Sequence, residues 1–188
     1  MQTSNGVYTT HGERKYLTVN ERERFIAEAI KADLSTLALC LLLCLTGCRI
    51  SEALGVLPIH VEADEGIVRF RTLKRRKGRV EWRHVPIPPK LVGLLQSLSQ
   101  APDTPLFGFS RTTAWRRIKK LMLAAGIEGA QATAKGARHY FGVHADAQGI
   151  PQPVLQRWMG HTKLETTSIY RQAVGEEEQQ LAERLCWV

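Results

Sequence analysis

At 188 residues the chain is long enough for one domain with a hydrophobic core and short for two such domains. Its apolar content of 44% is ordinary, but its net charge of +8 is not, and this excess lies between Arg69 and Lys90, where nine basic residues accompany one acid. Clustered positive charge favours a nucleic-acid partner, because each cation at a phosphate releases condensed counterions, and a well-solvated basic surface is an equal alternative.

The first part of the chain predicts a tail followed by two helices. Residues 1–15 are polar and contain glycine and threonine, and we expect a loose tail. A helix is predicted to begin after Thr18, because Thr18 and Glu21 have the spacing of a capping box. Asp33 is placed to cap the next helix, which is apolar throughout and ends near Gly47.

This apolar run, Leu34–Cys48, is too short for a membrane span and contains Ser35, Thr36 and Thr46. The N-terminus has no signal-peptide pattern, so we expect a cytoplasmic protein without a membrane segment. Cysteines four residues apart share one face of the helix, which favours core packing; they are Cys40, Cys44 and Cys48. No cysteine or histidine cluster has metal-ligand spacing, so no metal is expected.

A β-ribbon is predicted after the second helix. Val68 and Phe70 alternate with Arg69 and Arg71, which is typical of a strand with one apolar face. Val80–Ile87 is a second β-prone stretch, and a basic turn joins the two. We therefore predict a ribbon or sheet of two or three strands.

Two helices are predicted in the middle of the chain. Pro88 and Pro89 open the first of them, because proline suits the start of a helix. Ser110 can cap the second, whose basic run is expected to face outward. The residues expected to face the core from this second helix are Trp115, Ile118 and Met122.

The last third of the chain predicts three more helices. Thr133 can cap a helix over Ala134–Ala147, and a short helix follows that stops at Gly160. A final helix is predicted from about Lys163 past Tyr170. The predicted fold class is therefore mostly α with a small antiparallel β-ribbon or sheet.

Four blocks of sequence carry residues that suit attack on a phosphodiester. They are Thr46–Glu52 with Arg49, Arg138-His139, Gly160-His161, and Tyr170. Arginine stays charged and forks onto phosphate oxygens. A tyrosine hydroxyl can bond covalently to phosphorus and so divide one hard displacement into two easier ones. Taken singly, each residue has a structural reading, such as a surface ion pair or a packed aromatic ring.

Taken together and in this order, the four blocks resemble the tyrosine recombinase (phage integrase) family over roughly residues 16–174. The resemblance implies the catalytic-domain fold of that family. It also implies that Arg49, Arg138 and His161 contact the scissile phosphate, that Tyr170 is the nucleophile, and that Glu52 orients its neighbours.

Three further residues follow from the resemblance. Lys74 is the implied general acid for the leaving 5′-oxygen, a role worth on the order of 10²–10⁴ in rate. Lys77 and the flanking arginines remain alternatives, as does a solvated turn. Lys135 stands where the family most often has histidine, and it can still contact a non-bridging phosphate oxygen. His139 is expected to pack against or support the site.

DNA phosphates are expected to meet the basic residues of the ribbon and of the helix after Ser110. These residues are Arg69, Arg71, Arg75, Arg76, Lys77, Arg79, Arg116, Arg117, Lys119 and Lys120.

The implied function is site-specific DNA recombination through a 3′-phosphotyrosine link, without a metal or other cofactor. The implied partners are double-stranded DNA, other copies of the chain in a tetramer on two DNA sites, and a possible helper DNA-bending protein. Two alternatives stay open: type IB topoisomerase-like relaxation of DNA, and a DNA-binding regulator without catalysis.

The two ends of the chain carry separate expectations. Only about 15 residues precede the predicted catalytic domain, and in this respect the chain resembles the short fimbrial-switch invertases. The sequence leaves open whether this short N-terminus is natural. Residues 175–188 form an acidic tail with Leu181, Leu185 and Trp187. This tail is expected to dock on a neighbouring protomer or to pack on its own domain.

Overall fold

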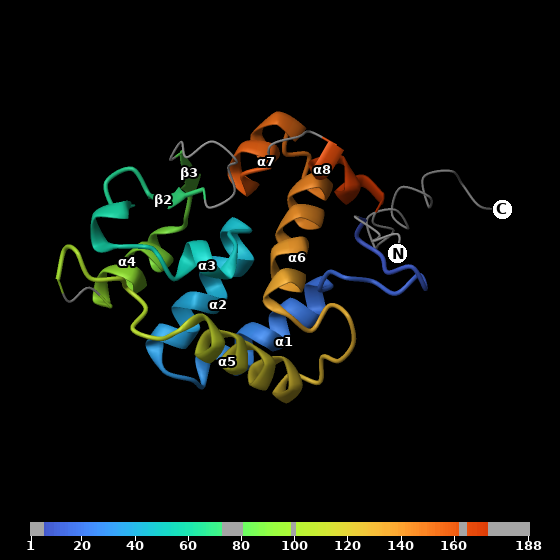
Figure 1. The fold of residues 1–188 in the computed structure, drawn as a ribbon, viewed down its shortest axis with the longest axis horizontal. Helices are drawn as coiled ribbons and strands as arrows, with labels where there is room; N and C mark the ends of the chain where they lie inside the picture. Colours follow the sequence, from blue (N-terminus) through green and yellow to red (C-terminus); the bar gives the residue numbers. More distant parts are fainter. Residues whose placement is uncertain (1–5, 73–80, 99–100, 162–164, 173–188) are drawn as a thin grey trace.

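The computed structural model describes residues 6–72, 81–98, 101–161 and 165–172. These residues form a mostly helical fold with one small antiparallel sheet, as Figure 1 shows. The helices and strands, in chain order, are α1 (Val19–Ile30), α2 (Leu34–Thr46), α3 (Ile50–Ala53), η1 (Pro58–His60), β1 (Val61–Glu62), β2 (Ile67–Arg71), β3 (Trp82–Pro86), α4 (Pro89–Ser97), α5 (Arg111–Ala124), α6 (Ala134–Ala147), α7 (Gln152–Met159), α8 (Glu165–Ser168) and η2 (Ile169–Gln172).

Helix α2 lies at the centre of the fold, where it contacts α1, α4, α5 and α6. Asp33 caps its first turn by accepting a hydrogen bond from the backbone N–H of Thr36. Gly47 ends it with φ of 60°, a left-handed conformation that favours glycine. Both predicted ends of this helix are confirmed, as is the Thr18–Glu21 capping box of α1.

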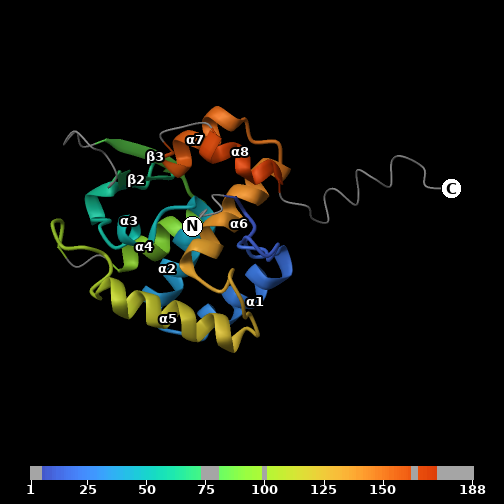
Figure 2. The same cartoon turned by 45° about the vertical axis from the view of Figure 1, so that its right-hand side comes forward.

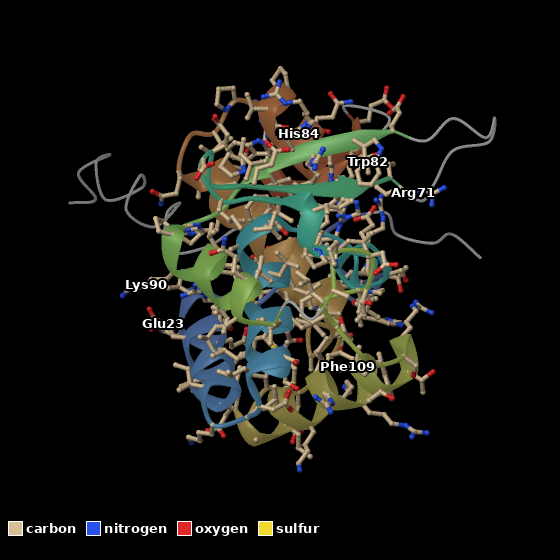
Figure 3. The ribbon with its side chains drawn as sticks, turned by 90° about the vertical axis from the view of Figure 1, so that its left-hand side faces the viewer. Glu23, Arg71, Trp82, His84, Lys90 and Phe109 are labelled. Carbon is tan, nitrogen blue, oxygen red and sulfur yellow. The ribbon has the colours of Figure 1, made fainter. Side chains whose placement is uncertain are left out.

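The sheet has the order β1-β2-β3, and both pairs of strands are antiparallel. Val68 and Phe70 of β2 are fully buried, whereas Arg71 is exposed, which confirms the predicted alternation. Phe70 is paired with Arg83 across the sheet. Figure 3 shows Arg71 and Trp82 at one end of the two long strands.

Helix α5 begins after Ser110 as predicted, but one of its side chains faces the other way. Trp115 was expected in the core and is instead 51% exposed. Ala114, Ile118 and Met122 form the buried row, with the four-residue spacing of one helical face. Trp115 lies about 100° around the helix from Ala114, which leaves its ring at the surface.

Residues 7–15 also differ from the loose tail that was expected over residues 1–15. Val7 is fully buried, and the chain turns back so that the backbone N–H of Lys15 bonds the carbonyl of Val7 at 2.8 Å. Val7 and Tyr16 pack in a second core cluster with residues of α6 and α7 and with Tyr170. Figure 2 shows this segment beside α6. The apolar side chains within the polar stretch are what fasten it to the domain.

Helix α6 begins after Thr133 and covers the predicted span, and α7 stops at Gly160, where φ is 62°. The last helix was predicted to continue past Tyr170. Its described part is instead one α-helical turn, α8, followed by the 3-10 turn η2. Thr166, Thr167 and Ser168 are poor helix formers, which is consistent with this break. Among the described residues, no helix is both long enough and apolar enough to span a bilayer.

Candidate active site

Arg138 on α6 is held by the ends of two helices. Its Nη1 donates to the carbonyl of Gly47, at the end of α2, and its Nη2 donates to the carbonyl of Met159 at 2.8 Å, at the end of α7. Carbonyls at a helix C-terminus lack partners within the helix and carry the negative end of the dipole. Burial and the charge of Arg49 lower the pKa of Arg138 to about 10, which leaves it charged at neutral pH.

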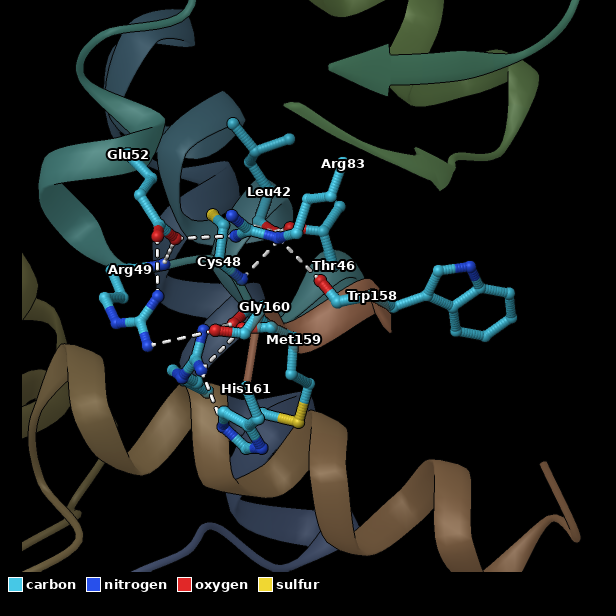
Figure 4. Close-up of polar contacts among 12 residues, drawn as sticks. Leu42, Thr46, Cys48, Arg49, Glu52, Arg83, Trp158, Met159, Gly160 and His161 are labelled. Carbon is cyan, nitrogen blue, oxygen red and sulfur yellow. Dashed lines mark hydrogen bonds and ion pairs between the residues drawn. The ribbon is translucent and has the colours of Figure 1, made fainter. Parts of the chain in front are cut away.

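The C-terminal end of α7 binds three arginines in succession. Its carbonyls at Trp158, Met159 and Gly160 accept hydrogen bonds, and the donors are Arg83 Nε at 2.8 Å, Arg138 Nη2 at 2.8 Å and Arg49 Nη2 at 3.5 Å, respectively. Figure 4 shows the guanidinium groups of Arg49 and Arg83 beside this chain segment. Since the three donors come from β3, α6 and the start of α3, this helix end fixes their relative positions.

Glu52 on α3 joins two of these arginines. Its Oε1 lies 2.6 Å from Arg49 Nη1, and its Oε2 lies 2.6 Å from Arg83 Nη2. Burial by itself would raise the pKa of Glu52, but the charge and hydrogen bond of Arg83, together with Arg49, hold it below its usual range. The carboxylate is therefore ionised and its side chain is fully buried.

Arg83 is the residue that the sequence reading missed. Arg83 is one of the nine basic residues between Arg69 and Lys90, yet it is 4% exposed and its guanidinium lies over the ring of Phe70, 4.9 Å from the centroid. Its position was a detectable signal, because Arg83 and Val85 are the two inward positions of β3. An arginine at an inward strand position needs a buried partner.

His161 lies between Arg138 and Thr167. Its Nε2 is 2.9 Å from Arg138 Nη2, and its Nδ1 is 2.9 Å from the hydroxyl of Thr167. A guanidinium can only donate, so Nε2 accepts and Nδ1 carries the hydrogen. Burial, followed by the charges of Arg138 and Arg49, lowers the pKa of His161 to about 3. The imidazole is therefore neutral in this arrangement.

Tyr170 is 2% exposed and lies against two histidine rings. The ring of His161 is stacked on it with centroids 6.1 Å apart, and the ring of His139 meets it edge-on at 5.8 Å. Burial raises the pKa of Tyr170 to about 12, and the charges of Arg138 and Arg49 oppose this shift. The proposed nucleophile is thus a protonated phenol enclosed beside the cationic cluster.

Two residues of α6 shape the pocket around the tyrosine ring. Gly142 faces it so closely that a Cβ atom at this position would lie 2.4 Å from the ring. His139 is buried with no described hydrogen-bond partner for either ring nitrogen. Burial and the charge of Lys135 lower the pKa of His139 to about 4, so this ring is neutral as well.

Lys135 lines a groove. It takes no part in the described hydrogen bonds that join Arg49, Glu52, Arg83, Arg138 and His161. This groove, of about 660 Å³, runs between the first turns of α5 and α6, and Lys135 is exposed in it. Ile50, the chain neighbour of Arg49, also lines the groove, and Lys135 precedes Arg138 by three residues on α6. The residues that line it are Lys15, Ile50, Arg111, Thr112, Trp115, Ala130, Thr133, Ala134 and Lys135.

The residues predicted to bind DNA differ in how available they are. Arg71, Arg116 and Lys120 are exposed. Arg117 pairs with Asp33 at 2.8 Å, Lys119 donates to the carbonyl of Ala132, and Arg69 pairs with Glu62. Lys74, together with Arg75, Arg76, Lys77 and Arg79, lies outside the described residues.

Among the described residues, no three His, Cys, Asp or Glu side chains lie close enough together to bind a metal ion. The described site consists of fixed cations and hydrogen-bond donors beside a tyrosine. Such groups stabilise charge on a phosphoryl centre without reorganising.

The fold agrees with the comparisons to known proteins. The chain belongs to the Phage integrase family, whose profile matches residues 15–177. It is 30% identical to tyrosine recombinase XerA of Pyrococcus furiosus, over 90% of this chain and 61% of that protein, and 28% identical to tyrosine recombinase XerD of Vibrio cholerae, over 79% and 53%.

Solved structures give the same result for the fold. A crystal structure of XerA recombinase has a TM-score of 0.76 at 25% identity, covering 90% of this chain and 64% of that one. The catalytic domain of bacteriophage HP1 integrase has a TM-score of 0.66 at 26% identity, covering 89% and 93%. The chain thus spans a little over half the length of the curated relatives and nearly all of the HP1 catalytic domain.

Proposed function

We propose that this chain is the catalytic part of a site-specific DNA recombinase that breaks and rejoins strands through a covalent 3′-phosphotyrosine. The observation that carries the proposal is the convergence of Arg49, Arg138 and a neutral His161 beside Tyr170, in a member of the Phage integrase family. Related proteins support DNA as the substrate, since XerH recombinase was solved on its palindromic difH substrate after cleavage.

The proposed reaction is a transesterification at phosphorus. The Oη of Tyr170 attacks the scissile phosphate and releases the phenol proton, the P–O5′ bond breaks, and the 5′-oxygen takes up a proton, which the family resemblance assigns to Lys74. Arg49 and Arg138 bear the charge that develops on the non-bridging oxygens. A 5′-hydroxyl of a partner strand then attacks the phosphotyrosine and restores the phenol.

Two features of the site bear on this reaction. Tyr170 is enclosed, so its ring must leave the pocket formed by His139, His161 and Gly142 before it reaches DNA. Lys135 lines the groove between the first turns of α5 and α6, about one helical turn from Arg138 on α6, which suits contact with a phosphate of the bound strand. We extend the proposal to a cytoplasmic, DNA-associated protein of bacterial, phage or plasmid origin that acts as a tetramer on two DNA sites, with a possible helper DNA-bending protein.

Covalent capture tests this proposal. The protein is mixed with a pool of nicked duplexes that carry a randomised central region, the reaction is stopped with detergent, and protein-linked DNA is sequenced. We expect a defined sequence linked through a 3′-phosphate to wild type and no link with Tyr170→Phe, which keeps the aromatic ring. An adduct with Tyr170→Phe would assign the nucleophile elsewhere.

The same material separates the alternatives to recombination. Relaxation of any supercoiled plasmid without a preferred site would identify a topoisomerase. Specific binding without an adduct would identify a regulator.

A further inference from the structure

We propose that Arg83 is a positioning residue of the active site, which sets the charge that Arg49 presents to the scissile phosphate. The inference rests on the proposed function and adds to it a residue that lies on β3, away from the four sequence blocks.

The first contact joins Arg83 to the catalytic arginine through Glu52. Glu52 Oε2 accepts from Arg83 Nη2 at 2.6 Å, and Glu52 Oε1 accepts from Arg49 Nη1 at 2.6 Å. The side chains of Glu52 and Arg83 are 0% and 4% exposed, so water screens this pair little. Figure 4 shows Glu52 with Arg49 on one side and Arg83 on the other.

The second contact joins Arg83 to the end of α7. Its Nε donates to the carbonyl of Trp158 at 2.8 Å, three residues before His161. A Cβ atom on Gly160 would lie 3.2 Å from Arg83 Cδ and Nη1, so the backbone passes directly over the guanidinium. The same side chain therefore supports both the α3 and the α7 sides of the site.

The third side of Arg83 faces its own sheet. The guanidinium lies over the ring of Phe70, its cross-strand partner, and its Nη1 is buried without a hydrogen-bond partner in the described structure. A buried arginine with an unused donor is not explained by packing alone, because an apolar side chain at this inward position would avoid the cost of desolvation.

Charge gives the reason for an arginine here. Arg49, Glu52 and Arg83 together carry one net positive charge, which is available to a phosphate at Arg49, the most exposed of the three. Without Arg83 the carboxylate would be neutralised by Arg49 alone, and the group would carry no net charge. Arg83 thus lets Glu52 orient Arg49 without cancelling its charge.

The test combines single and double variants in the full chain, on the duplex recovered by covalent capture. In single-turnover assays, Arg83→Met should slow adduct formation by about 10- to 100-fold. Its affinity for the uncleaved duplex should change much less. Adding Glu52→Gln to Arg83→Met restores the net positive charge and should recover at least part of the lost rate. Arg83→Lys keeps the charge without the fork and should be faster than Arg83→Met.

Arg24→Met is the matched control, since Arg24 bonds the carbonyl of Ala125 at another helix end. Its adduct rate should equal that of wild type. An Arg83→Met rate equal to wild type would overturn the inference, and so would a double variant no faster than Arg83→Met, which would reduce Arg83 to a structural role.

A second measurement does not depend on activity. The pKa of the Glu52 carboxyl, followed by NMR, should rise in Arg83→Met and rise less in Arg83→Lys, because the ammonium still faces the carboxylate. An unchanged pKa in Arg83→Lys and Arg83→Met alike would refute the coupling. If wild type formed no adduct while the pKa of Glu52 rose in the variants, the proposed function would be refuted. The coupling of Arg83 to Glu52 would still be supported.

Discussion

Substituting Gly142 by alanine should expel the ring of Tyr170 from its pocket. The added Cβ would lie 2.4, 2.5 and 2.6 Å from three carbons of the ring, whereas ordinary contact begins at 3.4 Å, so the ring must move by about 1 Å or leave. The neighbouring rings of His139 and His161 leave it little room within the pocket. Because Gly142 lies inside α6, the backbone itself accepts alanine readily.

The main consequence is a change in the acidity of the phenol. Burial is the largest cause of the raised pKa of Tyr170, which is about 12. An exposed ring returns toward the ordinary value of about 10, which makes the phenolate about 100-fold more populated at a given pH. Stability should also fall, by on the order of 1–2 kcal/mol, because burial of the ring is lost while the helix gains less than about 1 kcal/mol.

The assay is a titration of phenolate absorption in the near ultraviolet. The signal of Tyr170 is isolated by subtracting the Tyr170→Phe curve from wild type, and the Gly142→Ala/Tyr170→Phe curve from Gly142→Ala. Gly93→Ala is the matched control, since Gly93 is inside α4 and a Cβ there meets nothing within 4 Å. A Tyr170 pKa that stays at about 12 in Gly142→Ala would refute the reasoning.

Three other predictions follow from the site. Lys135→His should retain substantial adduct formation, because either side chain donates to a phosphate, whereas Lys135→Ala should lose about tenfold or more; equal rates for Ala and wild type in single-turnover assays would exclude Lys135 from the reaction. The pKa of His139 is about 6.5 in the unfolded chain and about 4 in the folded chain, so between these pH values only the unfolded chain binds the proton. The free energy of unfolding should therefore fall as pH drops from about 6.5 to about 4. Denaturant titrations at pH 7 and 4.5 should show His139→Phe losing on the order of 2 kcal/mol less than wild type, and equal losses would contradict the assignment. If about six phosphates are contacted, the affinity for DNA should fall with salt at a log–log slope of about −5 in anisotropy titrations, and a slope near zero would contradict a phosphate-binding surface.

The sequence predicts the helix ends well because the interactions that set them are local. Thr18, Asp33, Ser110 and Thr133 each bond a backbone N–H three residues away, and such bonds form wherever the local chain becomes helical. The inward face of β2 is equally local, since alternation of Val68 and Phe70 with arginines needs no knowledge of what covers the strand. Resemblance supplied the candidate residues of the site, but not their contacts.

Tertiary structure decided the features that depend on partners far along the chain. The inward position of Arg83 is tolerable only because Glu52, 31 residues earlier, lies beside it. Val7 is buried and Trp115 is exposed because a neighbouring element covers one and not the other, which the polarity of each residue alone does not indicate. The acidity of Tyr170 likewise depends on the rings and cations that the fold brings around it, since burial and nearby charges set a pKa. The sequence therefore predicts local hydrogen bonds and the alternation of apolar and charged residues along a strand. Burial and charge pairing depend on contacts between segments that are distant in the sequence.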